Sequence, residues 1–328
     1  MYRLTKPQES VYNMEKFSKG SIAVICGSIL VKGNQELSKL EDTIYEMYRL
    51  NDALRIRIAE TLNGTMQRVV PFAEQEIEVL HFAGKAQLEA YAAQYSKEPL
   101  ELYGSLCKIK IILLPDSYGI LVKLHHMVAD AWTLSLIGSQ FCAILNGRMP
   151  EVYSYTGYII SEEKYVQSAR YAKDRAFFLE QFKKCDEPVY LSEKQSLGAE
   201  ACRKTFVIDK AEAECLFAYA KKRNTSVFSL FMAAFAVYMS RIKMNADRFY
   251  IGTAILNRTG IKEKNTMGMF INTLPLLVKL DNHASFAENL ASVKGEIFSV
   301  IRHQKYNYAD MLSDIRKEYH FGEKLYDV

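Results

Sequence analysis

The sequence lacks any cysteine pattern that would indicate a disulfide framework or a zinc site. Its six cysteines include no C-x-x-C pair and are scattered along the chain, at Cys26, Cys107, Cys142, Cys185, Cys202 and Cys215. In a chain of this length, such thiols are typical of buried or incidental side chains in a reducing compartment. No other group of His and Cys residues has the spacing of metal ligands, so we expect no bound metal.

The sequence also lacks a signal peptide and a membrane span. Residues 1–19 are polar with scattered aromatic side chains, whereas a leader has a basic start followed by an apolar run. The most apolar stretch, Val227 to Met239, is shorter than the roughly 20 residues that cross a bilayer, and it has helical periodicity. We therefore expect a cytoplasmic protein without a membrane partner.

The sequence also lacks a large excess of basic or acidic residues. The 42 basic residues nearly balance the 38 acidic ones, which leaves a net charge of +4, and no dense Lys/Arg block occurs. This pattern does not favour a nucleic-acid partner. With 49% hydrophobic and 24% charged residues over 328 positions, the chain is typical of a globular protein and more consistent with two domains than one.

The stretch with the clearest chemical content runs from Leu121 to Trp132 and reads LVKLHHMVADAW. It begins as a β-strand after a turn at residues 115–117 and leads into a predicted helix from Ala131. His125 and His126 are adjacent, so an extended backbone points them to opposite sides. One ring can then lie in the interior while the other faces a cleft.

This motif suits proton transfer, because imidazole titrates near neutral pH. Two roles fit Asp130: it could bond a histidine nitrogen directly, or pair with a distant arginine and fix the loop. A chance cluster of two histidines and an aspartate is equally consistent with the pattern alone. A zinc site fits less well, since it needs three or four ligands.

Hydrophobic periodicity elsewhere predicts mixed strands and helices in both halves of the chain. The predicted strands that bear on the fold lie at residues 106–114, 118–124, 203–208, 249–255 and 274–280, and an apolar helix is predicted at 227–242. This order is typical of an α/β layer structure with the histidine motif at the end of a central strand.

The segment HHMVADA resembles the HHxxxDG active-site motif of condensation domains of nonribosomal peptide synthetases, with Ala131 in place of the usual glycine. Acyltransferases related to chloramphenicol acetyltransferase share its His-His-Asp core. Trp132, two residues after Asp130, is similar to the tryptophan of condensation domains with a DGW sequence. Other segments resemble the same family, in family order: LTKPQESVYNME (4–15), NDALRIRI (51–58), IGTAILNRTG (251–260), MGMFINTLP (267–275) and RHQKYNYADML (302–312).

The resemblance implies an α/β fold of α+β type with mixed sheets. It further implies two chloramphenicol acetyltransferase-like lobes arranged as a V with a channel between them. We expect an N-terminal lobe at residues 1–160, a connector at 161–190 and a C-terminal lobe at 191–328. Family members continue past the point that matches Val328, so we expect the C-terminal lobe to be incomplete. The resemblance does not decide whether this chain is active.

The activity implied by the resemblance is amide formation between a donor acyl or peptidyl thioester and an acceptor aminoacyl thioester. Both would be carried on phosphopantetheine arms of peptidyl carrier domains, with a neighbouring adenylation domain and no cofactor bound by the chain itself. Two alternatives stay open: a noncatalytic condensation-like module that recruits a partner, and an acyltransferase that uses a soluble amine or alcohol.

The resemblance also assigns residues. His126 is expected to touch the acceptor amine, while His125, Asp130, Ala131 and Trp132 shape the loop. Arg55 and Arg258 are rival partners for Asp130. The candidates for lining the channel are Asn257, Gly268, Phe270 and Asn272.

Overall fold

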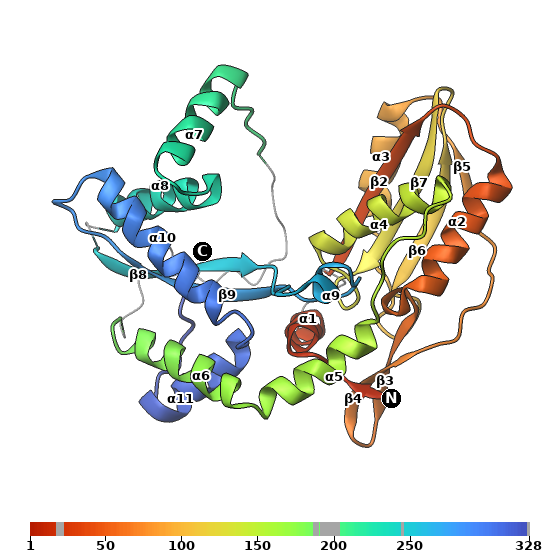
Figure 1. The fold of residues 1–328 in the computed structure, drawn as a ribbon. Helices are drawn as coiled ribbons and strands as arrows, with labels where there is room; N and C mark the ends of the chain where they lie inside the picture. Colours follow the sequence, from red (N-terminus) through yellow and green to blue (C-terminus); the bar gives the residue numbers. More distant parts are fainter. Residues whose placement is uncertain (18–22, 186–189, 191–203, 244–245, 327–328) are drawn as a thin grey trace. The chain divides into compact units, whose positions relative to one another are not determined.

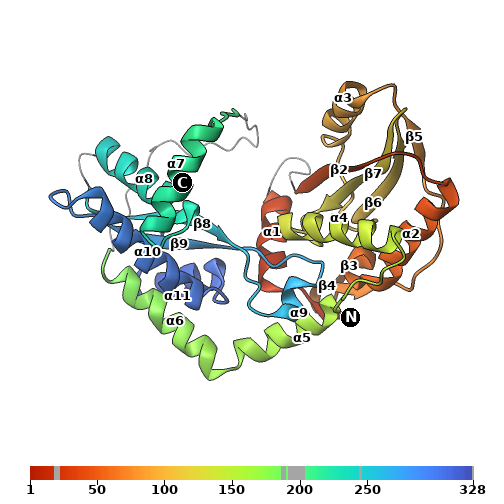
Figure 2. The same ribbon diagram turned by 45° about the horizontal axis from the view of Figure 1, so that its top comes forward.

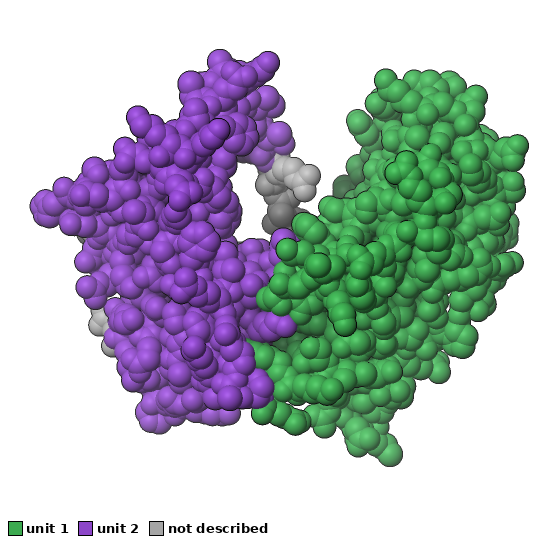
Figure 3. Space-filling view, viewed as in Figure 1, with its two compact units in different colours: residues 1–167, 258–271 green, residues 168–257, 272–328 purple. Residues whose placement is uncertain are grey.

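The computed structural model describes residues 1–17, 23–185, 190, 204–243 and 246–326. The chain forms two compact units, coloured separately in Figure 3. Unit 1 comprises residues 1–167 and 258–271, and unit 2 comprises residues 168–257 and 272–328. The short segment 258–271 thus belongs to unit 1, although the strands on both sides of it in the sequence belong to unit 2. The division into lobes at 1–160, 161–190 and 191–328, and their V arrangement, stay predictions.

The strand that carries the histidine motif is the centre of unit 1. This strand, β7 (Ser117–His125), is buried over all nine residues and pairs antiparallel with a neighbour on each side. The sheet has the order β2-β7-β6-β5, formed by β2 (Val24–Lys32), β6 (Cys107–Leu113) and β5 (Val79–His81). The two strands predicted on either side of the turn at 115–117 are therefore confirmed, and they pair as a hairpin.

Alternate side chains of β7 enter two different cores. Tyr118, Ile120, Val122 and Leu124 join the larger core, which also holds residues of α2 (Leu37–Leu50) and α4 (Ala131–Leu145). Leu121 points the other way, into a smaller core with α3 (Lys85–Tyr95). Helices thus cover both faces of the sheet (Figures 1 and 2). A strand covered on both faces is apolar throughout, as the sequence of β7 nearly is.

A second, smaller sheet, three α-helices and one 3-10 helix complete the described part of unit 1. The sheet has the order β1-β4-β3. Its strands and the remaining elements are β1 (Tyr2–Arg3), α1 (Lys6–Phe17), the 3-10 helix η1 (Asp52–Arg55), β3 (Ile56–Thr61), β4 (Gly64–Val69), α5 (Tyr155–Val166) and α9 (Ile261–Lys264). Unit 1 is thus a mixed α/β structure, as predicted.

Unit 2 is built on an antiparallel pair of strands, β8 (Arg248–Ile255) and β9 (Asn272–Lys279). Figure 2 shows α6 (Ala169–Phe182) beside α11 (Tyr308–Tyr319). The other helices are α7 (Lys210–Lys222), α8 (Val227–Ile242) and α10 (Phe286–Arg302). Side chains of α6, α8, α10, α11 and both strands share one apolar core.

One predicted strand of unit 2 is wrong. Residues 204–208 have no regular secondary structure, while residue 203 lies outside the described part of the chain. Phe206 and Val207 are 85% and 91% exposed. An alternating pattern needs a neighbouring strand and a buried face to become a strand, and this segment has neither among the described residues.

The described residues contain no single helix that is long and apolar enough to cross a membrane. One helix pair, α7 with α8, meets the length and composition requirement only when taken together, and it bends by 97° at the break. Five cysteines are free thiols in the structure, while Cys202 lies outside the described residues.

Candidate functional site

The two histidines at the end of β7 have different surroundings. The His125 side chain is fully buried, whereas His126 is partly exposed. Within the His126 ring, Nδ1 is a buried atom without a hydrogen-bond partner among the described residues, whereas Nε2 is not among the buried atoms that lack a partner. The structure thus places the two rings as the alternation of an extended backbone requires.

The backbone around His126 is fixed on both sides. The N–H of His126 donates to the Ala23 carbonyl at 2.7 Å, and the N–H of Val128 donates to the His125 carbonyl at 3.0 Å. Between them, the Met127 carbonyl accepts from Nε2 of the buried Gln8 at 2.8 Å. These bonds hold the peptide group before His126 and the one after Met127, which limits where the His126 ring can go.

The His125 ring acts on this backbone too. Its Nδ1 accepts a hydrogen bond from the N–H of Met127 at 3.1 Å. A neutral imidazole has one donor and one acceptor nitrogen, so the proton of this ring is on Nε2. Glu15 Oε1 lies 3.8 Å from that Nε2. Burial lowers the pKa of His125, and the Glu15 carboxylate opposes part of that shift.

His126 is also neutral near pH 7. Burial lowers its pKa below the usual value of 6.5, while the Ala129 backbone carbonyl and the Asp130 carboxylate oppose the shift. A neutral imidazole in a partly exposed side chain can accept a proton or a hydrogen bond from a bound amine. Of the predicted site residues, His126 is therefore the one whose chemistry is accessible.

Asp130 organises the loop through its two oxygens. As the N-cap of α4, its Oδ1 accepts from the N–H of Thr133 at 2.9 Å and from the Thr133 hydroxyl at 3.0 Å. Oδ2 accepts from the N–H of Phe270 at 3.2 Å. Nη2 of Arg258 donates to both oxygens, at 3.0 and 3.1 Å. Of the two roles predicted for Asp130, the structure shows pairing with a distant arginine.

Arg258, and not Arg55, is that arginine. The Arg55 guanidinium donates instead to the carbonyls of Tyr48 and Val70, at 2.8 and 2.6 Å. Arg258 is buried, as is Asp130. Its Nη1 donates to the Thr266 carbonyl at 2.6 Å, and its guanidinium carbon lies 3.9 Å from the centre of the Phe270 ring. This ion pair has the additional hydrogen bonds that a buried pair requires.

Gly268 permits the close packing of this segment. Its φ of +149° is rarely adopted by residues with a side chain, and a Cβ placed here would come within 2.2 Å of the Tyr155 ring. The Gly268 N–H donates to the Thr133 hydroxyl at 3.0 Å, and Tyr155 donates to the Met269 carbonyl at 2.8 Å. A glycine is therefore required where segment 258–271 meets α4 and α5.

The remaining predicted residues are placed as follows. Ala131 is the exposed first residue of α4, so its position does not require a glycine for steric reasons. Trp132 Nε1 donates to the Lys264 carbonyl at 2.8 Å. Asn272 Nδ2 donates to the carbonyls of Gln304 and Tyr306, at 3.0 and 2.9 Å.

The four candidates for channel lining, Asn257, Gly268, Phe270 and Asn272, are all buried. The structure shows Phe270 and Asn272 in packing and hydrogen bonding within their own units. A role in lining a channel stays a prediction for all four.

Sequence reasoning missed several residues that position the motif. Gln8 and Glu15 contact the histidine end, and Thr133 and Tyr155 support the aspartate end. The sequence could have indicated Gln8 and Glu15, because residues seven apart share one face of a helix. The buried residues Val11 and Tyr12 lie on that face too. Thr133 is the third residue after the N-cap Asp130, and a cap side chain accepts from the backbone N–H at that position.

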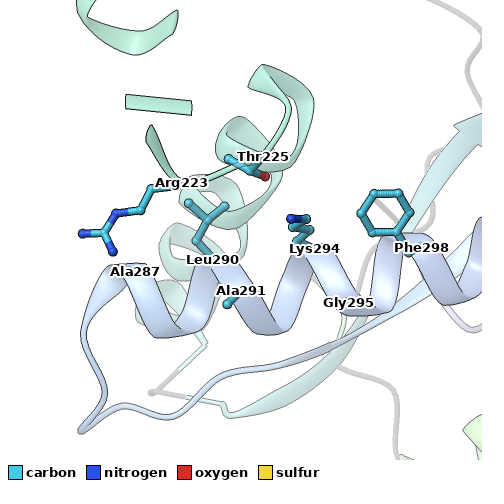
Figure 4. A pocket seen from close by; sticks show the side chains of 8 residues that line it. All are labelled: Arg223, Thr225, Ala287, Leu290, Ala291, Lys294, Gly295 and Phe298. Atoms are coloured by element: carbon cyan, nitrogen blue, oxygen red, sulfur yellow. The ribbon is translucent and has the colours of Figure 1, made fainter. Parts of the chain in front are cut away.

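His126 lines neither of two large cavities, one in each unit. In unit 1, a cavity of about 850 Å³ is lined by residues of α5 and α9 and by Tyr153. In unit 2, a cavity of about 400 Å³ lies beside α10, where Leu290, Lys294 and Phe298 project toward Arg223 and Thr225 (Figure 4). The described residues include no group of three or more His, Cys, Asp or Glu side chains that could hold a metal ion.

Comparison with known proteins gives one consistent result. The family profile described as "Condensation domain" matches residues 1–327. Surfactin synthase subunit 1 of Bacillus subtilis (strain 168) is 27% identical over 347 residues, which cover 100% of this chain and 10% of that protein. One subunit of plipastatin synthase from the same organism is 28% identical over 339 residues, covering 97% and 13%. The chain thus spans only about a tenth of these relatives.

Solved structures share the fold. The first condensation domain of the calcium-dependent antibiotic synthetase, in complex with substrate analogue 2a, superimposes with a TM-score of 0.81 at 19% identity, covering 99% of this chain and 78% of that one. The condensation domain of the Monacolin K polyketide synthase MokA gives 0.84 at 19%, covering 99% and 77%. The predicted chloramphenicol acetyltransferase-like α/β fold is confirmed. With its family profile matched along nearly the whole sequence, the chain belongs to the condensation-domain family.

Proposed function

We propose that this chain catalyses amide formation between a donor acyl or peptidyl thioester and the α-amine of an acceptor aminoacyl thioester. The observation that carries the proposal is the state of His126: its ring is neutral and partly exposed and its backbone is fixed, while His125 and Asp130 beside it are fully buried. Family membership supports the same activity. The relatives include subunits of surfactin and plipastatin synthases and a dimodular nonribosomal peptide synthase of Bacillus subtilis (strain 168).

In the proposed reaction, the amine nitrogen attacks the carbonyl carbon of the donor thioester. The new C–N bond forms, the C–S bond breaks, and the donor phosphopantetheine leaves as a thiolate. The proton lost by the amine passes to His126 Nε2 and then to the thiolate, or His126 orients the amine and stabilises the charge of the intermediate. Holding two tethered reactants together supplies a large part of such a rate enhancement.

The remaining residues prepare this ring. Asp130 and Arg258 fix the loop from its C-terminal end, and Gln8 fixes the carbonyl that follows His126. The partners in this proposal are a donor and an acceptor peptidyl carrier domain with their phosphopantetheine arms, together with a neighbouring adenylation domain that loads the acceptor. We also infer a cytoplasmic location, where free thiols such as Cys107 persist.

The test is a single-turnover assay with loaded donor and acceptor carrier proteins, read by intact mass spectrometry of the acceptor carrier. His126→Ala should lower amide formation by about a hundredfold or more, as the loss of a general base or orienting group does. His283→Ala is the matched control, because His283 is an exposed turn residue of unit 2. Unchanged turnover in a folded His126→Ala protein would reject the proposal.

The same assay separates the alternatives. One solved structure of this fold, SgcC5 from Streptomyces globisporus, is a complex with a naphthyl ethanediol, so a soluble alcohol and a soluble amine belong among the acceptors. Product only with a soluble acceptor, still dependent on His126, would indicate an acyltransferase of that kind. Carrier binding without product from any acceptor would indicate a recruitment module.

A further inference from the structure

Helix α1 contacts the histidine end of the motif at two points. Gln8 and Glu15 lie on one face of α1, on either side of the buried Val11 and Tyr12. Gln8 bonds the Met127 carbonyl at 2.8 Å, and Glu15 faces His125 Nε2 at 3.8 Å. The peptide group that precedes Met127 and the one that follows it are thus both held by residues that α1 controls.

The state of His125 decides one of these two contacts. The N–H of Met127 donates to His125 Nδ1, and it can do so only while that nitrogen carries no proton. The proton must then be on Nε2, a buried atom that has no hydrogen-bond partner at normal distance among the described residues. An N–H group left in such a position is unfavourable unless a negative group faces it.

Glu15 supplies that negative group. Its side chain is only 11% exposed, and its Oε1 lies at ion-pair distance from Nε2, beyond an ordinary hydrogen bond. A carboxylate in a partly desolvated site favours the ring tautomer that turns an N–H toward it. The other titratable ring beside His125 is His126, and its burial favours the neutral form.

We propose that Glu15 is a positioning residue for His126: its carboxylate holds His125 in the Nε2–H tautomer, so that Nδ1 accepts the Met127 N–H and fixes the backbone next to His126. Glu15 touches neither substrate nor the reacting atoms in this role. The inference rests on the proposed function only where it concerns rate. The tautomer of His125 is a property of the folded chain.

The experiment compares Glu15→Leu, which removes the acceptor, with Glu15→Gln, which keeps an oxygen in place. Glu9→Leu and Glu9→Gln are the matched controls, because Glu9 lies on the same helix in a partly exposed pair with Lys6. Should Glu15→Leu not fold, Glu15→Ser gives the same comparison with a side chain too short to reach Nε2. The full chain is labelled with ¹⁵N-histidine, and its six histidines are assigned from single replacements.

Two readouts are taken from each protein: the His125 tautomer from long-range ¹H–¹⁵N spectra, and the rate of amide formation on loaded carriers. The wild type should show an unprotonated Nδ1. Glu15→Leu should lose that signature and form amide about ten to a hundred times more slowly, as a misplaced reacting group does, with the apparent KM for the carriers little changed. Glu15→Gln should retain the tautomer and most of the rate.

Every other outcome would overturn one part of the proposal. A wild-type tautomer in Glu15→Leu overturns the role of the carboxylate, whatever the rate. An altered tautomer with an unchanged rate overturns the link to His126. If His126→Ala itself retains activity, the proposed function fails, while the tautomer spectra still decide whether Glu15 controls His125.

Discussion

The two ends of the motif are held by different kinds of contact. At the histidine end, α1 and the strand neighbours hold neutral rings through backbone hydrogen bonds, and one of the two side chains stays partly exposed. At the aspartate end, segment 258–271 supplies Arg258 and the Phe270 N–H to a fully buried carboxylate. A buried charge needs its partner in the folded state, so the second end stabilises the fold. We propose that the first end serves the chemistry.

The largest expected effect on stability is at Arg258. Arg258→Met leaves Asp130 as a buried, unpaired carboxylate, so we expect the free energy of unfolding to fall by about 3–5 kcal/mol. Urea denaturation followed by circular dichroism measures it. Arg55→Met is the control: Arg55 bonds backbone carbonyls and should lose about 1–2 kcal/mol.

A double variant sharpens this prediction. Asp130→Asn with Arg258→Met removes the buried charge together with its partner, so its loss should be smaller than the sum of the two single losses. If Arg258→Met loses no more stability than Arg55→Met, the aspartate end is not held by its ion pair.

The next effect is at Gly268. Gly268→Ala forces a side chain into a positive-φ position and against the Tyr155 ring, which should lower the free energy of unfolding by about 2–4 kcal/mol. Gly157→Ala is the same change in α5, in open space, and should stabilise the protein by about 0.5–1 kcal/mol. Thermal unfolding of the two proteins should shift in opposite directions, and a shared direction would contradict the packing argument.

A smaller effect is expected at Thr133. Its hydroxyl bonds Asp130 and receives the Gly268 N–H, so Thr133→Val should lower the free energy of unfolding by about 1–3 kcal/mol through unsatisfied buried groups. Thr133→Ser keeps the hydroxyl and should recover most of the loss. Equal losses in the two variants would assign the effect to the missing methyl group instead.

These residues also show how much of the structure can be predicted from the sequence. The strand β7, the helix that follows it and the order of the family segments were predictable, because alternation, caps and motifs are local signals. The choice of Arg258 over Arg55 was not, since it depends on segment 258–271 joining unit 1 across more than a hundred residues. The strand predicted at residues 203–208 failed for the same reason: its pattern is local, while the pairing that would form it is not.

The smallest expected effect is a change of stability with pH at the histidine end. The folded pKa of His126 lies below its unfolded value of 6.5, so its neutral state stabilises the fold above pH 6.5. That contribution is lost as the pH falls through 6.5 toward the folded pKa, because the unfolded chain then binds more protons.

Glu162 also affects how the free energy of unfolding changes with pH. Burial raises its pKa to about 7, so its contribution has the opposite sign to that of His126. The measurement is therefore the difference in unfolding free energy between wild type and His126→Ala, at pH 5.5 and pH 7.5. The wild-type protein should be relatively less stable at the lower pH. A difference that does not change with pH would contradict the assignment of a buried neutral ring.

The most direct test of the comparison measures both properties in one variant. His126→Ala is purified, its urea unfolding curve is recorded, and one turnover is followed between loaded donor and acceptor carriers. We expect a free energy of unfolding close to that of the wild type, and amide formation on the acceptor carrier slowed by about a hundredfold or more. A folded His126→Ala protein that forms amide at the wild-type rate would contradict it.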